Sequence, residues 1–149
     1  MAKVTVHTEG GYRSVITNPE NLTAIADETV ESGGSSAGLT PSQLLLGALG
    51  SCMAITAKMY AERKGWPLED VRIELEHERF ENGAYAPYTG SEPFVHEIRE
   101  RFTLIGDLDE KQRERIIAIA QKCPVRRVLQ YPVFFVDEVV KQELTAEGE

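Results

Sequence analysis

The chain has 149 residues, a length that fits one domain, and its 42% hydrophobic and 27% charged residues are typical of a globular protein with enough apolar material for a core. The formal net charge of -8 disfavours nucleic acid and anionic membranes as partners. The first residues lack the apolar segment and cleavage site of a secretory signal. We therefore expect one cytoplasmic domain over residues 1–149.

The N-terminal part of the chain predicts an antiparallel meander. Three short stretches rich in alternating apolar and polar residues are separated by turn-forming pairs: 3–7, 12–17 and 22–26, with Gly10-Gly11 and Asn18-Pro19 between them. The next segment, 27–39, is rich in glycine and serine. Such a composition is unfavourable for both strand and helix, so we expect a loop.

A long helix is predicted after this loop. Thr40 is a typical N-cap, Pro41 suits the first helical position, and Gln43 lies three residues after the cap, as in a capping box. The helix should run to about Lys64, because Gly65 offers a C-cap.

The middle of this helix is apolar on almost every side. Residues 44–57 carry no charge, but this stretch is shorter than the roughly 20 residues needed to cross a bilayer. It therefore indicates a buried helix and no membrane partner. Small residues within it would let another backbone approach closely: Gly47, Ala48, Gly50, Ser51 and Cys52. One domain has little with which to cover such a helix, so we predict a homodimer that shares its core.

The second half of the chain predicts further strands and helices. Their expected limits are 71–75 and 94–104 for two strands, 109–121 and 125–129 for two helices, and 133–140 for a last strand. His96 and Glu100 interrupt the apolar positions of the second of these strands, which suggests a bulge or an edge position. The histidines are dispersed and show no metal spacing: His7, His77 and His96. Because strands cluster before and after the helices, the fold class is α+β.

The two cysteines, Cys52 and Cys123, lie in unlike surroundings. Neither belongs to a CxxC motif or to a ladder with zinc spacing, so an ordinary metal site lacks ligands. Cys52 is placed in the middle of a helix, where a thiolate would need an arginine from elsewhere in the fold or from a partner subunit. Cys123 is better placed, since Pro124 suits the start of a new helix with free N–H groups. For each thiol, an inert packing role is the alternative to redox chemistry.

The adjacent Arg126-Arg127 pair is expected on a solvated face or, beside Cys123, as a site for an acidic substrate or reductant.

Two segments form a specific pair of motifs. They are Thr40-Pro41-Ser42-Gln43-Leu44-Leu45-Leu46-Gly47-Ala48-Leu49-Gly50-Ser51-Cys52 and Cys123-Pro124-Val125. Together with the glycine-rich lead-in at Gly33-Gly34, they resemble the OsmC/Ohr family of osmotically inducible and organic-hydroperoxide-resistance proteins. The resemblance implies an intertwined homodimer, with antiparallel strands of both subunits wrapped around long central helices and active sites at the subunit interface.

The resemblance also implies a chemistry for the two thiols. In that family the first cysteine, here Cys52, attacks an organic hydroperoxide and becomes a sulfenic acid. The second, here Cys123, condenses with it to a disulfide that a lipoyl-type dithiol reduces, so the protein needs no bound cofactor. The family's activating arginine follows a Gly-Gly turn, which makes Arg13 the nearest candidate. Such an arginine would stabilise the thiolate and the developing charge on the leaving oxygen.

One departure from the family's pattern concerns this arginine. The peroxidases carry a glutamate just after the helix-starting proline, where this chain has Ser42 and Gln43. Gln43 is either a weakened orienter of the arginine, lacking the charge of a carboxylate, or the capping-box partner of Thr40. The departure leaves an alternative function: a non-peroxidatic OsmC-like protein that binds a small apolar ligand at the dimer interface or senses oxidants through the same thiols.

Overall fold

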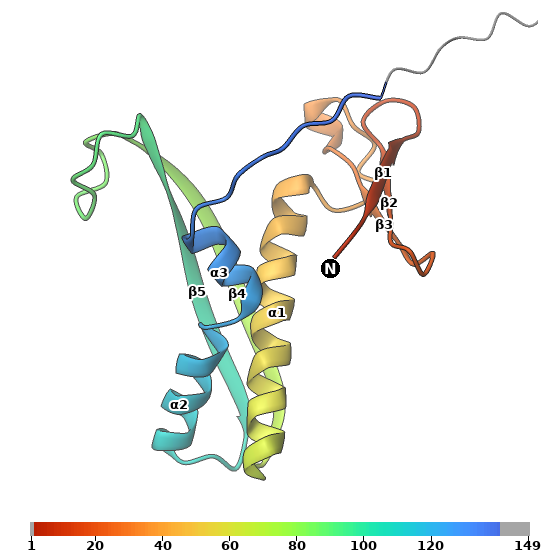
Figure 1. Ribbon diagram of the computed structural model, residues 1–149. Helices are drawn as coiled ribbons and strands as arrows, with labels where there is room; N and C mark the ends of the chain where they lie inside the picture. The colour runs from red at the N-terminus through yellow and green to blue at the C-terminus, as the bar shows by residue number, and fades with distance from the viewer. Residues whose placement is uncertain (1, 141–149) are drawn as a thin grey trace, which may run out of the picture.

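The computed structural model describes residues 2–140, in which strands precede and follow a long central helix. In chain order the elements are β1 (Thr5–Thr8), β2 (Ser14–Thr17), β3 (Thr23–Ala26), a short 3-10 helix η1 (Val30–Ser32), α1 (Pro41–Lys64), β4 (Leu68–Glu81), β5 (Phe94–Gly106), α2 (Glu110–Ala120) and α3 (Pro124–Gln130). α1 packs against β4, α2 and α3, and the β1–β3 sheet lies off the N-terminal end of α1 (Figure 1). The predicted α+β class is confirmed.

α1 begins and ends where its sequence signals predict. The Thr40 side chain accepts the N–H of Gln43 at 3.3 Å, and the Gln43 side chain accepts the N–H of Thr40 at 2.9 Å. At the other end Gly65 adopts φ 65°, a left-handed conformation that favours glycine, and its N–H bonds back to the carbonyls of Ala61 and Glu62. Both helix ends therefore have their free backbone groups satisfied.

The core lies along one side of α1. Buried residues recur every fourth position on this helix: Leu49, Met53, Ala57 and Ala61. They pack with buried residues of β5, α2 and the connecting turns: Leu104, Leu108, Ile116, Ala120 and Cys123. By length and composition α1 could cross a membrane, but the core helix of a soluble protein meets the same criteria. Here the helix supplies the apolar stripe around which the hairpin and α2 pack.

β4 and β5 form a long antiparallel hairpin. Its register places apolar residues opposite one another on the face toward α1: Val71 with Leu104 and Ile73 with Phe102. The register is shifted between Leu68 and Asp70 and is regular at His96 and Glu100, so the bulge predicted near these two residues is wrong. Because this sheet has two strands, both are edge strands. This agrees with the other predicted reason for His96 and Glu100 in the strand, an edge position. Glu100 also has a partner of its own, described below.

The N-terminal meander is confirmed as the antiparallel sheet β1-β2-β3. The loop after it contains η1 and is built around the buried carboxylate of Asp27, which is 2% exposed. This carboxylate accepts the backbone N–H groups of Glu28, Ser35 and Ala37 and the Ser35 hydroxyl. These hydrogen bonds, the Ser35 hydroxyl first among them, outweigh burial and lower the pKa of Asp27. Gly34 is required in this loop, since a Cβ there would lie 2.1 Å from the Glu28 carbonyl oxygen.

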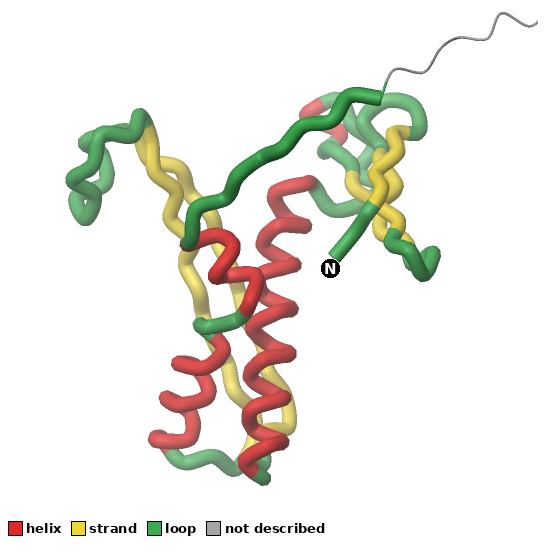
Figure 2. The backbone as a smooth tube through the Cα atoms, viewed as in Figure 1, coloured by secondary structure: helices red, strands yellow, loops and turns green. Residues whose placement is uncertain are grey.

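The last predicted strand, 133–140, is wrong for the described part of this chain. After α3 the backbone is extended but has no ladder partner, and it runs toward the β1–β3 end of the molecule (Figure 2). Its apolar side chains are mostly exposed: Val133, Phe134, Phe135, Val136, Val139 and Val140. The segment is rich in valine and phenylalanine, which favour strands, but a strand needs a neighbour to accept and donate its hydrogen bonds.

Candidate functional site

The fold brings the two cysteines together. Cys52 lies halfway along α1, and Cys123 is the N-cap of α3; both are free thiols. Cys123 is fully buried, while half-buried Cys52 packs against the core cluster to which Cys123 belongs. The two thiols are close enough for Cys52 to raise the pKa of Cys123. The pair of motifs singled out in the sequence therefore forms one site at the contact between α1 and α3.

The surroundings of Cys123 favour its protonated form. Its sulfur accepts the backbone N–H of Arg126 at 3.4 Å, as the helix start at Pro124 predicts. Burial has the largest effect and raises the pKa of Cys123; the Arg126 N–H lowers it, and the neighbouring Cys52 thiol raises it further. The advantage in forming a thiolate that the sequence predicts for Cys123 is thus outweighed by burial.

A buried ion pair lies next to this site. Arg126, in the first turn of α3, places Nη1 2.5 Å from both carboxylate oxygens of Glu100 on β5. Gln121, which ends α2, donates its Nε2 to the same carboxylate at 3.4 Å. The Glu100 side chain is 10% exposed and that of Arg126 is 25% exposed. The solvated face expected for Arg126-Arg127 is therefore wrong for Arg126, although Arg127 is exposed.

A sequence signal for this ion pair did exist. Glu100 occupies an inward-facing position between apolar residues of β5, and a carboxylate at such a position needs a partner. The partner lies on another element far along the chain, so the sequence does not identify which arginine it is.

Arg13 and Gln43 lie away from the thiols in this chain. Arg13 follows the β1–β2 turn and pairs with the carboxylate of Glu9. The same turn faces the glycine-rich loop, where the Tyr12 ring lies 3.2 Å from the position that a Gly33 Cβ would take. Gln43 uses its side-chain oxygen in the capping box of α1. The capping interpretation of Gln43 is confirmed, and its role as an arginine orienter stays a prediction.

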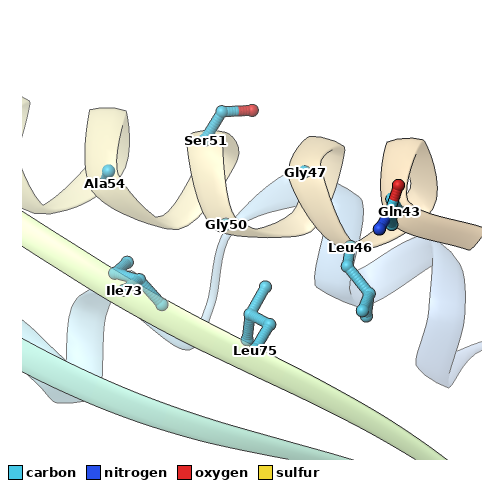
Figure 3. Close-up of a pocket in the computed structure, with 8 residues that line it drawn as sticks. All are labelled: Gln43, Leu46, Gly47, Gly50, Ser51, Ala54, Ile73 and Leu75. Atoms are coloured by element: carbon cyan, nitrogen blue, oxygen red, sulfur yellow. The ribbon is translucent and has the colours of Figure 1, made fainter. Parts of the chain in front are cut away.

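A groove of about 420 Å³ runs between α1 and β4 (Figure 3). Small and apolar residues of both elements line it, together with two polar residues of α1: Leu46, Gly47, Gly50, Ala54, Ile73 and Leu75, with Gln43 and Ser51. Cys52 is not among these residues. The groove and the thiols therefore occupy different sides of α1.

The side of α1 that carries Cys52 also exposes an apolar stripe, which we call the α1 seam. Its members are spaced alternately three and four residues apart: Leu45, Ala48, Cys52, Ile55 and Met59. Leu45, Ile55 and Met59 are 49%, 58% and 55% exposed. This is the spacing with which one helix packs along another. The sequence predicts an apolar helix, but it does not indicate which side of the helix is buried and which is exposed.

Two of the histidines are also brought together. His77 Nε2 lies 2.8 Å from His96 Nδ1 across the β4–β5 hairpin. Their dispersal in the sequence is thus misleading, since antiparallel pairing makes them neighbours. Among residues 2–140, no group of three or more histidine, cysteine, aspartate or glutamate side chains is arranged to hold a metal ion.

Comparison with known proteins agrees with the motif pair. Residues 33–136 match the sequence profile of the family described as OsmC-like protein. No curated protein sequence matches the chain.

Three solved structures illustrate the structural likeness. An OsmC-like protein of Mycoplasma pneumoniae aligns with a TM-score of 0.69 at 18% identity, over 87% of each chain. The organic hydroperoxide resistance protein OsmC of Legionella pneumophila gives 0.62 at 20% identity, over 87% of this chain and 89% of that one. The organic hydroperoxide resistance protein OhrB of Bacillus subtilis gives 0.59 at 19% identity, over 87% and 90%. At these identities the likeness shows the fold alone.

Proposed function

We propose, on the premise that this chain belongs to the OsmC-like protein family, that it is a thiol peroxidase which reduces organic hydroperoxides. The observation that carries the proposal is that Cys52 packs against the core cluster that contains Cys123, so that the two thiols lie together at the contact between α1 and α3. Two thiols in contact can store an oxidising equivalent as a disulfide without an external resolving thiol. The Legionella and Bacillus relatives, whose names record organic hydroperoxide resistance, support the choice of substrate class.

The first step uses Cys52 as the nucleophile. Its thiolate attacks the terminal oxygen of the hydroperoxide, which keeps its hydrogen, so that an S–O bond forms and the O–O bond breaks. The alkoxide that leaves takes up from solvent the proton that the thiol released when it ionised, and becomes the alcohol. The product at Cys52 is a sulfenic acid. Cys52 suits this role better than Cys123, because it is only half-buried while burial raises the pKa of Cys123.

The second step uses Cys123 as the resolving thiol. Its sulfur attacks the sulfenic sulfur of Cys52, forming the S–S bond and releasing water, which takes up the Cys123 proton. An external dithiol of the lipoyl type then reduces the disulfide by two thiol exchanges and itself becomes a cyclic disulfide. The protein requires no resident cofactor for this cycle, and we place it in the cytoplasm, where thiols are kept reduced.

The active unit in this proposal is an intertwined homodimer. The α1 seam exposes apolar side chains around Cys52, and the extended segment 133–140 exposes more. Exposed apolar side chains in such numbers are typical of a protein interface. The β1–β3 sheet lies away from the thiols of its own chain, so the partner subunit's Arg13, held by Glu9, is the candidate to activate Cys52.

A second function is favoured by one observation. The groove between α1 and β4 is lined largely by apolar and small residues, and neither Ser42 nor Gln43 supplies the carboxylate of the family's peroxidases. A non-peroxidatic protein would bind a small apolar ligand in such a groove. It would sense oxidants, if at all, through slow oxidation of the thiols.

Steady-state turnover of several organic hydroperoxides with a dihydrolipoyl reductant tests the proposal. We expect saturable turnover that depends on Cys52. A protein that oxidises once but does not turn over, or binds apolar probes without reducing any hydroperoxide, would favour the second function.

A further inference from the structure

The resolving thiol sits on an element that has little else to hold it. α3 has seven residues and none of them is buried, a length at which a helix has almost no stability of its own. The chain that follows is extended and unpaired up to residue 140. Val125 makes an apolar contact with the core, but it is only partly buried. Cys123 itself is buried in the core, but the helix that it begins needs another contact to hold it in a fixed position beside α1.

The ion pair between Arg126 and Glu100 supplies such a connection. It joins the first turn of α3 to the middle of β5, and Gln121 adds the end of α2 to the same carboxylate. Arg126 also donates its backbone N–H to the Cys123 sulfur, so one residue links the thiol to the ion pair. A carboxylate that is 10% exposed loses most of its hydration, which makes separation of the pair unfavourable.

We propose that Arg126, Glu100 and Gln121 form a clamp that positions Cys123 for disulfide formation with Cys52. The three residues are positioning residues: they act through α3 and do not touch the substrate. The inference rests on the proposed disulfide step and deepens it, because it explains how a short helix holds the resolving thiol beside α1.

The clamp acts on the equilibrium between the dithiol and the disulfide. In this reaction the two thiols lose two electrons and two protons to an oxidised dithiol, and the S–S bond forms. A clamp that holds Cys123 near Cys52 raises the effective concentration of one thiol toward the other. Its loss lets α3 sample positions in which the sulfurs are apart, so the disulfide becomes easier to reduce.

The experiment is a redox titration of the full chain against mixtures of oxidised and reduced dithiothreitol, with the disulfide quantified by mass spectrometry after alkylation. We expect Glu100→Gln to lower the equilibrium constant for disulfide formation at least about tenfold, which is about 30 mV for a two-electron couple. Arg126→Gln should have the same effect, and the double variant should add little, because the two residues act as one unit. Arg126→Lys, which keeps the charge, should lose less than Arg126→Gln.

The matched control is Glu74→Gln. Its carboxylate accepts a hydrogen bond from Arg101 at 2.7 Å across the same hairpin, but both side chains are mostly exposed. We expect no change of potential in this variant. If Glu100→Gln proves too unstable to titrate, the comparison of Arg126→Lys with wild type answers the same question.

Two results would overturn the inference. One is a reduction potential of the Cys52–Cys123 disulfide that is unchanged in the Glu100 and Arg126 variants, or that shifts by the same amount in Glu74→Gln. The other is the absence of any Cys52–Cys123 disulfide in the wild-type titration. Because this titration contains no hydroperoxide, it is independent of the peroxidase assay: a protein that forms the clamped disulfide but has no turnover contradicts the proposed function and leaves the clamp intact.

Discussion

The two cysteines are held by very different helices. Cys52 lies on α1, which has 24 residues, capped ends and four buried side chains along its length. Cys123 begins α3, which has seven residues and no buried side chain. Cys52 is half-buried on a helix that the core holds along its length, whereas Cys123 is itself buried in the core but begins a helix that adds no buried side chain. A nucleophile must be accessible to the substrate, whereas a resolving thiol must come close enough to the nucleophile to form a bond with it. The helices that carry the two thiols therefore have different requirements.

The largest expected effect separates the chemical roles of the two thiols. Cys52→Ser should lower turnover at least about a thousandfold, since removal of a covalent nucleophile leaves no alternative route. Cys123→Ser should permit one oxidation of Cys52, which then stays a sulfenic acid or oxidises further. Mass spectrometry after stoichiometric hydroperoxide distinguishes the two products. Ser51→Ala, beside Cys52 on α1, is the control, and full turnover by Cys52→Ser would refute the assignment.

The second effect tests how much side-chain packing on α1 and on α3 contributes to the free energy of unfolding. Met53→Ala, in the fully buried stripe of α1, should lower the free energy of unfolding by about 2–5 kcal/mol. Val128→Ala, on the exposed side of α3, should change it by no more than about 0.5 kcal/mol. Urea titrations of both reduced proteins provide the measurement. Similar losses at the two positions would mean that α3 is anchored by packing after all.

The third effect concerns the exposed side of α1. Ile55→Glu places a charge in the α1 seam and should weaken the proposed dimer at least about a hundredfold, as buried charges without partners do. Sedimentation at several concentrations measures this, and the thermal midpoint of the wild type should rise with protein concentration. Lys111→Glu, on the exposed surface of α2, should leave the dimer intact. A stable folded monomer at micromolar concentration in the wild type would contradict the dimer.

The fourth effect follows from the burial of Cys123. Its pKa is raised above the ordinary value of 9.0, so the folded protein keeps the thiol protonated where the unfolded chain begins to ionise. Its contribution to stability should be complete below pH 9 and should decline as the pH rises through the folded-state pKa. Urea midpoints of the reduced protein between pH 7 and 10 should therefore fall more steeply in the wild type than in Cys123→Ala. Equal slopes would show that burial does not suppress ionisation of this thiol.

The smallest effect decides the role of Gln43. Gln43→Glu keeps the capping box and adds a negative charge at the N-terminus of α1, which should raise the free energy of unfolding by about 0.3–1 kcal/mol without changing the rate of Cys52 oxidation. Gln112→Glu is the matched control, because Gln112 forms the same kind of box with Asp109 on α2. A faster Cys52 oxidation in Gln43→Glu alone, measured by stopped flow, would instead support an arginine orienter at this position.

Prediction from the sequence succeeded where the signal was local. The ends of α1 follow from Thr40, Pro41 and Gly65, because caps and turns act within a few residues. The start of α3 at Pro124 follows for the same reason. Prediction failed for the segment 133–140, since its valine and phenylalanine residues favour a strand but do not show which neighbour such a strand would pair with.

The candidate site shows the same difference between local sequence signals and contacts made over long distances in the chain. The sequence by itself determined most of the elements, the two thiols and the family, because these depend on residue types and spacings along the chain. Only the tertiary structure decided that Cys52 lies beside Cys123 and that Arg126 pairs with Glu100. Such contacts join residues far apart in sequence, and their strength depends on burial, which removes water from charges and thiols and is a property of the packed molecule alone.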